Sequence, residues 1–305
     1  MFFFEAIPWQ SWLVWLGILA GLMALNEVTR YSKYTGLAFF VALPLVLSVF
    51  VWPRTSGIGS GSQTANWFAW VKVYSALVGC YIGLGMRYTR MKDKKWCYLL
   101  VPAILGLNIL EAVVREFQVM GMQGVIDDMF FMGGPWNAMN GIAGLINMLT
   151  ICGWYGVVFG KGKSRDLVWP DMMWFWIIAY DLWNFAYVYN CVTDRAFYSA
   201  ALLISCTIPA FLIKKGAWAQ HRVHTLALYM MLMMTVPDFF VKSDYAVAST
   251  HSPAAYYAIS VLALVFNVGV GIYQVYTIVR KRKNPLKDDL YSDSKSYQAV
   301  LAENR

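Results

Sequence analysis

Charged and amide side chains recur within the apolar segments of this sequence. Asp181 and Asn184 lie three residues apart in AYDLWNFAYVYN (179–190), among tryptophan, phenylalanine and tyrosine. Glu111 and Arg115 lie four residues apart in another apolar segment. Because residues three or four apart share a helix face, each pair can present a charged group and a second polar group together. In an apolar medium such groups bind ions or solutes, exchange protons, or hold helices to one another.

The depth of these residues along their segments predicts that they meet. At about 1.5 Å per residue, Glu111, Asp181 and Asp238 lie roughly 20 Å from the basic ends of their segments. Lys72 lies roughly 8 Å from the opposite end of its own segment. We therefore predict one polar pocket with walls of tryptophan and tyrosine. Its candidate binding residues are Lys72, Asn108, Glu111, Arg115, Asn140, Asp181, Asn184 and Asp238.

The charges of these side chains suggest their roles. Glu111, Asp181 and Asp238 are candidate proton or cation groups. Lys72 and Arg115 are candidate counter-charges or anion contacts. The alternative interpretation is structural: Glu111 can pair with Arg115 on its own helix, and Lys72 can neutralise Asp181 or Asp238 to hold helices together. Intramembrane ionisable groups are more often functional, and we favour the pocket.

The elements that would position these residues are membrane-spanning helices. Of the 305 residues, 59% are hydrophobic, 17% aromatic and 14% charged, and the mean hydropathy is +0.49. A soluble domain carries about 25% charged residues, and a helix needs about 20 mainly apolar residues to cross a bilayer. We predict an all-α, polytopic integral membrane helix bundle. Its nine segments are roughly 9–27, 35–52, 67–86, 96–117, 137–159, 169–190, 196–213, 223–240 and 254–279.

Lysine and arginine alternate between the connections of these segments. The connections after the first, third, fifth and seventh segments and the chain after the ninth are rich in both, whereas the others hold one basic residue or none. Short cytoplasmic connections collect Lys and Arg, so we predict the N-terminus outside and the C-terminus in the cytoplasm. The net charge of +8 is then explained by anchoring residues that meet anionic lipid. Membrane lipids are expected partners, and nucleic acid is not.

The chain divides into a transmembrane domain, 1–280, and a cytoplasmic tail, 281–305. The tail has no apolar period until its last few residues, so we expect it to be mostly flexible. The connection 119–136 mixes Met, Phe and Val with Asp127 and Asp128 but holds no Lys or Arg. It is predicted to be a short interfacial or re-entrant element, either a lid over the pocket or an ordinary surface loop.

Metal and cofactor chemistry is not indicated by the remaining candidates. His221 and His224 lie three residues apart beside Arg222, but no Cys or acid is spaced to complete a zinc site. We interpret them as polar residues at the membrane edge. The five cysteines fit no CxxC pattern. The sequence therefore predicts no metal and no cofactor.

Two stretches resemble an uncharacterised family of bacterial multi-pass membrane proteins. They are YDLWNFAYVYN (180–190) and, after the following helix, AWAQHR (217–222). That family carries no activity that could be transferred. The resemblance implies a location in the cell membrane, specifically a bacterial inner membrane.

The sequence favours transport or binding of a small solute or ion through a polar pocket that opens to the outer side. An intramembrane enzyme acting on a lipid-linked or amphiphilic substrate is the alternative, with Asp181 or Glu111 as general base. A structural or accessory membrane subunit is the third possibility. A path that continues inward would indicate transport, and a blind pocket open to lipid would indicate an enzyme. The sequence identifies neither the substrate nor the oligomeric state.

Overall fold

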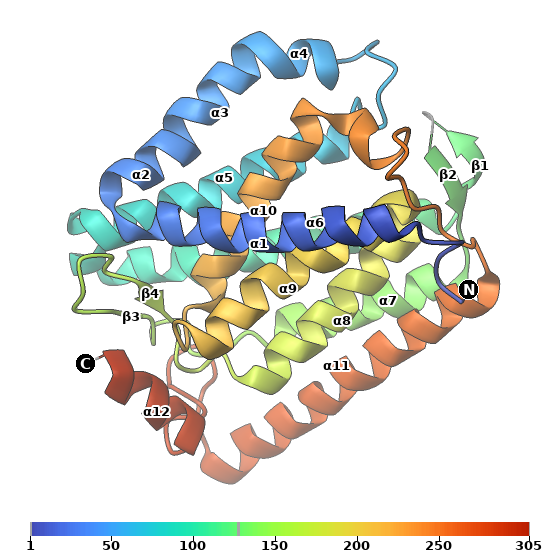
Figure 1. The fold of residues 1–305 in the computed structure, drawn as a ribbon. Helices are drawn as coiled ribbons and strands as arrows, with labels where there is room; N and C mark the ends of the chain where they lie inside the picture. The colour runs from blue at the N-terminus through green and yellow to red at the C-terminus, as the bar shows by residue number, and fades with distance from the viewer. Residues whose placement is uncertain (1, 127–128, 305) are drawn as a thin grey trace.

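The chain folds into long α-helices that run between the two ends of the molecule (Figure 1). The computed structural model describes residues 2–126 and 129–304. Within these residues, each of the nine predicted apolar segments contains a helix. The helices are α1 (Trp9–Tyr31), α2 to α4 with two π-helical joints (Lys33–Thr55), α5 (Trp67–Tyr88), α6 (Leu100–Val119), α7 (Pro135–Leu149), α8 (Trp174–Cys191), α9 (Ala196–Leu212), α10 (Trp218–Thr235) and α11 (Pro253–Lys281).

Six of the helices in the described part of the chain are long and apolar enough to cross a membrane. They are Trp9–Tyr31, Lys33–Thr55, Trp67–Tyr88, Lys95–Val119, Thr193–Leu212 and Pro253–Lys281. The other three, α7, α8 and α10, have 15, 18 and 18 residues, and most side chains of α8 and α10 are buried. The predicted all-α helical bundle is confirmed. Nine membrane crossings and the orientation of the chain remain predictions.

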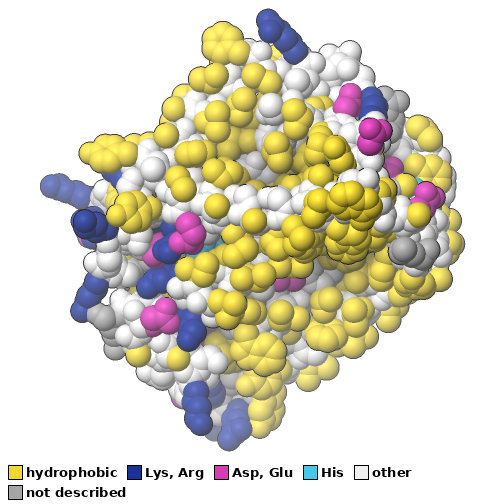
Figure 2. Space-filling view, in the orientation of Figure 1, with side chains coloured by type: hydrophobic (Ala, Val, Ile, Leu, Met, Phe, Trp, Pro, Cys, Tyr) yellow, Lys and Arg dark blue, Asp and Glu magenta, His cyan; other side chains and the backbone are white. Residues whose placement is uncertain are grey.

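The outer helices of the bundle carry apolar side chains on their exposed faces. α11 packs against α7 and α8, and α1 packs against α9 and α10. α2 to α4 run along the upper edge of the view in Figure 1. Figure 2 shows hydrophobic side chains across the middle of the molecule, with Lys and Arg mostly toward the end that holds the C-terminus. Such a belt is expected of a surface that faces lipid.

The eighth predicted segment differs from α10 at both ends. α10 begins at Trp218, so Arg222 lies inside the helix and not before it. The helix ends at Thr235 because proline disfavours helical backbone in the residue before it, and Val236 adopts φ −132° and ψ 62°. Pro237 therefore ends the helix, and Asp238 lies in the 3₁₀ turn η6 (Pro237–Phe240). The prediction that Asp238 lies within a spanning helix is wrong for this reason.

The C-terminal segment is packed against the bundle, although the sequence predicts a mostly flexible tail. It contains α12 (Lys295–Asn304). The Asp171 carboxylate accepts hydrogen bonds from the backbone N–H groups of Leu290 (2.9 Å) and Tyr291 (2.7 Å). Four apolar residues anchor the segment, and all are buried: Leu290, Tyr291, Tyr297 and Leu301. Their spacing gives no regular period, and their partner is a distant loop, so the packing was not visible in the sequence.

The connection between α6 and α7 forms a β-hairpin of β1 (Gln123–Ile126) and β2 (Met129–Met132). Asp127 and Asp128, which the sequence singled out, lie outside the described residues. The inward side chains of β2 are Met129 and Phe131, and both are buried. The hairpin lies at the same end of the molecule as the N-terminus (Figure 1). A role as a lid remains a prediction.

The orientation of the bundle can be tested directly. A reporter fused after the last residue should report the cytoplasm, because the C-terminus lies on the predicted side of the basic connections. An epitope inserted in 55–64 should be accessible from outside intact cells, because that connection lies on the predicted opposite side. If both tags were accessible from the same side, the number of crossings between residues 55–64 and the C-terminus could not be odd, and the nine-segment arrangement would be contradicted. An accessible C-terminus with a protected 55–64 would reverse the orientation.

Candidate functional site

A cavity lies among α5, α6, α8, α9 and α10, near the points where α5 and α9 begin and α8 ends. With its opening it encloses about 740 Å³. Four basic side chains from four elements line it: Lys72, Arg115, Arg195 and Arg222. Among the described residues no Asp or Glu lines it. The remaining lining combines amides and hydroxyls with aromatic, Leu, Val and Met side chains, including Asn66, Asn184, Ser199, Tyr187, Tyr229, Leu226 and Met233.

Arg195 and Arg222 are buried, and each has guanidinium N–H groups without a hydrogen-bond partner in the described part of the chain. Arg195 is 3% exposed and Arg222 is 4% exposed. Arg222 donates from Nε to the Tyr180 hydroxyl (3.1 Å) and from Nη2 to Asn184 Oδ1 (3.4 Å). Its Nη1, and Nε and Nη2 of Arg195, have no hydrogen-bond partner within the described part of the chain. A buried charged donor without a partner costs several kcal/mol, so these groups call for an acceptor that is not part of the protein.

Lys72 and Glu111 form an ion pair beside the cavity. Lys72 Nζ lies 3.2 Å from Glu111 Oε2 and donates to the Asn108 carbonyl oxygen (2.8 Å). Ser75 also donates to Glu111 Oε2 (3.0 Å). The structure therefore pairs Glu111 with Lys72 across two helices, not with Arg115 on its own helix. The consequence is that Lys72 is not available to neutralise Asp181 or Asp238.

Arg115 lines the cavity and has no carboxylate partner among the described residues. It donates to Gln118 Oε1 (2.8 Å), and its guanidinium carbon lies 5.9 Å from the Phe68 ring centre and 5.2 Å from that of Phe131. Lys72 Nζ lies 5.7 Å from the same Phe68 ring. The faces of aromatic rings attract cations. Phe68 and the hairpin residue Phe131 thus hold two cations at the cavity without cancelling their charge.

Two of the predicted pocket acids do not reach the cavity. Asp181 faces α9, where its Oδ2 accepts a hydrogen bond from Thr207 (2.7 Å). Asp238 lies on the surface, with 60% of its side chain exposed, and pairs with Lys242 (3.1 Å). The prediction that Lys72, Glu111, Asp181 and Asp238 share one cavity is therefore wrong for both Asp181 and Asp238. Equal depth along a helix does not fix the direction in which a side chain points.

The amide candidates have three different surroundings. Asn184 lines the cavity beside Arg222, as predicted. Asn108 accepts from Lys72 through its carbonyl and lines a second cavity. Asn140 donates to Glu116 Oε1 (2.6 Å) in a separate polar cluster. Of the eight predicted residues, the structure thus brings Lys72, Arg115 and Asn184 to the first cavity, with Glu111 paired to Lys72 behind its wall.

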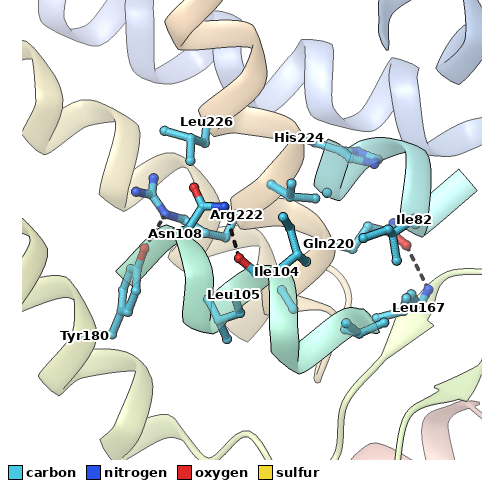
Figure 3. Close-up of a pocket in the computed structure, with 15 residues that line it drawn as sticks. Ile82, Ile104, Leu105, Asn108, Leu167, Tyr180, Gln220, Arg222, His224 and Leu226 are labelled. Carbon is cyan, nitrogen blue, oxygen red and sulfur yellow. Dashed lines mark hydrogen bonds between the residues drawn. The ribbon is translucent and has the colours of Figure 1, made fainter. Parts of the chain in front are cut away.

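A second cavity lies along α5, α6 and α10, nearer the basic end of the bundle. Gly79, Ile82, Ile104, Asn108, Gln220 and His224 are among the residues that line it. Arg222 and Leu226 line both cavities. Figure 3 shows Arg222 between Tyr180 and Asn108, with Gln220 hydrogen-bonded to the backbone of Leu167 at the far side. Arg222 therefore stands where the two cavities meet.

His221 and His224 are buried in the bundle and do not lie at its edge. His221 Nδ1 lies 2.7 Å from Asn26 Nδ2, and His224 Nδ1 lies 3.3 Å from Thr29 Oγ1. Both histidines are at most 1% exposed. They join α10 to α1, and the interpretation as edge residues is wrong because α10 begins one turn earlier than predicted.

A polar cluster around Asp166 lies at the basic end of the bundle, near the start of α10. Asp166 accepts from Arg30 (2.8 Å), Ser164 (2.7 Å) and Gln220 (2.8 Å). Burial alone would raise the pKa of Asp166, but the hydrogen bonds and the charges of Arg30 and Arg87 lower it below the ordinary 3.8. The carboxylate is therefore charged at neutral pH and ties the loop before α8 to α1 and α10.

Three functional candidates escaped the sequence analysis: Arg195, Arg222 and Glu116. In the sequence, Arg195 is the single basic residue of the connection after the sixth predicted segment, and Arg222 belongs to the basic connection before the eighth. Glu116 is adjacent to Arg115 and falls on a different face of α6 from Glu111. Extending the eighth segment back to Trp218 would have placed Arg222 inside a helix. No comparable signal in the sequence marks Arg195.

The fold and the site together define a class: an all-α helical bundle, with six helices in the described residues that are apolar enough to cross a membrane, built around a cavity lined by buried cations. The chain belongs to a family of unknown function, DUF5692, whose sequence profile matches residues 5–303. That match spans nearly the whole chain, including α12. The comparisons with curated proteins and with solved structures gave no significant match. Bacterial origin and an inner-membrane location remain predictions.

Proposed function

We propose that this chain is a multi-pass membrane protein that binds a small organic anion in the cation-lined cavity and carries it across the membrane. The observation that carries the proposal is the set of unpartnered guanidinium N–H groups of Arg195 and Arg222. Planar guanidinium groups bind carboxylates and phosphates through paired, charge-assisted hydrogen bonds. An anion at this position would supply the acceptors that the protein lacks.

The charges that line the cavity support an anion over a cation. Among the described residues, the lining has four positive side chains, Lys72, Arg115, Arg195 and Arg222, and no negative one. The nearby carboxylates lie outside the lining: Glu111 pairs with Lys72, Asp194 with His251 and Asp238 with Lys242, and Asp181 accepts from Thr207. Removing uncompensated charges from water costs several kcal/mol for each ion. A bound anion offsets that cost, whereas a bound cation would add to it. The Leu, Val, Met and aromatic lining suits an apolar group on the same molecule.

The second cavity supports transport over catalysis. α5 and α10 line the first cavity in one half of their length and the second cavity in the other, and Arg222 belongs to both. Transport requires a path along the bundle, and the two cavities lie one after the other along it, with Arg222 and Leu226 in both walls. The two acids considered as general bases are engaged elsewhere, Glu111 by Lys72 and Asp181 by Thr207. The geometry therefore favours passage of an anion over proton abstraction from a substrate.

Flux measurements on the purified protein in liposomes test this proposal. We expect saturable uptake of radiolabelled phenylphosphonate, because its charge matches the cavity and its ring matches the apolar lining. Benzamide, which is neutral, and benzamidinium, which is positive, should not compete for uptake. Liposomes without protein provide the background. The proposal would be contradicted if benzamide and benzamidinium competed as strongly as unlabelled phenylphosphonate. It would also be contradicted if uptake were no faster than the background.

A further inference from the structure

Glu116 of α6 is surrounded by a cage of three amide side chains, two from α7 and one from α8. Its side chain is fully buried, with 0% exposure. Asn137 donates to Oε2 (2.7 Å), and Asn140 donates to Oε1 (2.6 Å), both from α7. Asn190 of α8 donates to Oε1 (3.2 Å) and to the hydroxyl of Ser260 on α11 (3.0 Å). The carboxyl group is thus held by neutral donors alone.

No cation pairs with Glu116 among the described residues. On its own helix Arg115 is directed to Gln118 and two phenyl rings. The packed face of α7 offers only Asn137 and Asn140. α8 contributes the Cys191 thiol and the Tyr187 phenol, and α11 contributes Ser260 together with Tyr256, which bonds to Thr193. A charged Glu116 would therefore have no counter-ion among these groups, and binding a proton would remove that charge.

The cage can serve both protonation states of the carboxyl group. The Oδ1 atoms of Asn140 and Asn190 are buried and have no hydrogen-bond partner in the described part of the chain. An amide carries a donor and an acceptor. Rotation of either amide would therefore present an acceptor to the O–H of a protonated Glu116. The carboxyl group thus has donors for its charged form and two unpartnered acceptors nearby for its protonated form. This arrangement suits a group that gains and loses a proton.

Glu116 also lies directly behind the wall of the anion cavity. Asn137 Nδ2, which binds Glu116, lies 3.9 Å from the Cys191 sulfur, and Cys191 lines the cavity. Arg115, the neighbouring residue in the chain, lines it too. A negative charge at Glu116 would repel an anion across this wall, and electrostatic interactions are only weakly screened in such surroundings.

We propose that Glu116 is a proton-binding site whose occupancy is coupled to the anion, so that one proton is taken up from solution when the anion binds. The inference rests on the proposed anion binding. Because coupling between two sites is reciprocal, protonation of Glu116 strengthens anion binding by the same factor as the anion strengthens proton binding. In transport, the anion would then move together with a proton.

The test is titration calorimetry with benzenesulfonate, an anion that does not itself titrate, on the purified protein between about pH 5 and about pH 9, where buried carboxylic acids titrate. For the wild type we expect affinity to fall at least about fivefold as pH rises, the lower end of ordinary coupling between sites. Glu116→Gln, which mimics the protonated group, should bind as tightly as the wild type at low pH and show no pH dependence. Asp181→Asn, a buried acid outside the cavity, is the matched control and should keep the wild-type dependence.

Proton uptake by the wild type gives a second measurement that needs no variant. Calorimetry in two buffers with different ionisation enthalpies reports the protons bound with the anion. We expect up to one proton per anion, and none for Glu116→Gln. Binding by the wild type without proton uptake and without pH dependence overturns this inference while leaving anion binding intact. The inference is also overturned if Asp181→Asn abolishes the dependence and Glu116→Gln keeps it. Failure of the wild type to bind at every pH refutes the proposed function instead.

Discussion

Replacing Arg222 with glutamine is expected to weaken the binding of phenylphosphonate by roughly 30-fold to several thousand-fold, the equivalent of about 2–5 kcal/mol. Arg222 lies where the two cavities meet, and its Nη1 has no partner in the described chain. Glutamine can still bond to Tyr180 or Asn184 but supplies neither the charge nor the paired N–H groups. The measurement is calorimetric titration of wild type and variant in the same detergent.

The stability of the same variant separates a binding role from a structural one. Removing a buried charge that lacks a counter-ion does not destabilise a fold and can stabilise it. We therefore expect Arg222→Gln to melt at the wild-type temperature or above. Arg90→Gln, at an exposed position, is the matched control and should change neither quantity. An Arg222→Gln protein that binds phenylphosphonate like the wild type, or that loses binding only because it unfolds, would count against the proposed site.

Replacing Glu111 with glutamine is expected to destabilise the protein by about 3–5 kcal/mol, because it leaves a buried Lys72 without its counter-ion. The pair has side-chain exposures of 8% and 9%. The double variant Lys72→Met/Glu111→Gln removes both charges and should recover most of the loss. Thermal or denaturant unfolding in detergent measures the difference between the single and double variants.

The exposed pair Asp238–Lys242 provides the control for this second prediction. Its side chains are 60% and 52% exposed, so Asp238→Asn should cost less than about 1 kcal/mol. Should Glu111→Gln be as stable as Asp238→Asn, the Lys72–Glu111 pair would not be the buried contact that the structure indicates. Should the double variant be no better than the single one, Lys72 would not be the group left unpaired.

The positions of the helices could be predicted from the sequence because hydropathy and length determine them. All nine predicted apolar segments contain a helix in the described residues. Helix ends were less predictable, since they depend on single residues. Pro237 ends α10 before Asp238, and the apolar run that begins near Val223 hid the polar first turns from Trp218 to Arg222. Shifting this one boundary moved Arg222 from the surface to the centre of the site.

The composition of the site was only partly predictable, because periodicity does not show what a side chain meets across the bundle. Lys72, Arg115 and Asn184 were predicted and line the cavity. The structural alternative paired Glu111 with Arg115, four residues away, but Glu111 pairs with Lys72 of α5 at 3.2 Å. Asp181 has the predicted depth and turns toward Thr207 instead. The cavity is cationic because α8 turns Asp181 toward α9 and because the shifted ends of α10 remove Asp238 and bring in Arg222. Spacing along the sequence shows neither the rotation of a helix nor its ends.

A crystal structure with 4-iodobenzoate tests the central claim most directly, because the anomalous signal of iodine locates the ligand without ambiguity. We predict an iodine peak among the apolar residues of the cavity, with the carboxylate oxygens within hydrogen-bond distance of Arg195 and Arg222. The neutral 4-iodobenzamide, soaked in parallel, should give no peak there. An iodobenzoate peak only outside the cavity, or peaks of equal strength from the two compounds inside it, would contradict anion binding at these arginines.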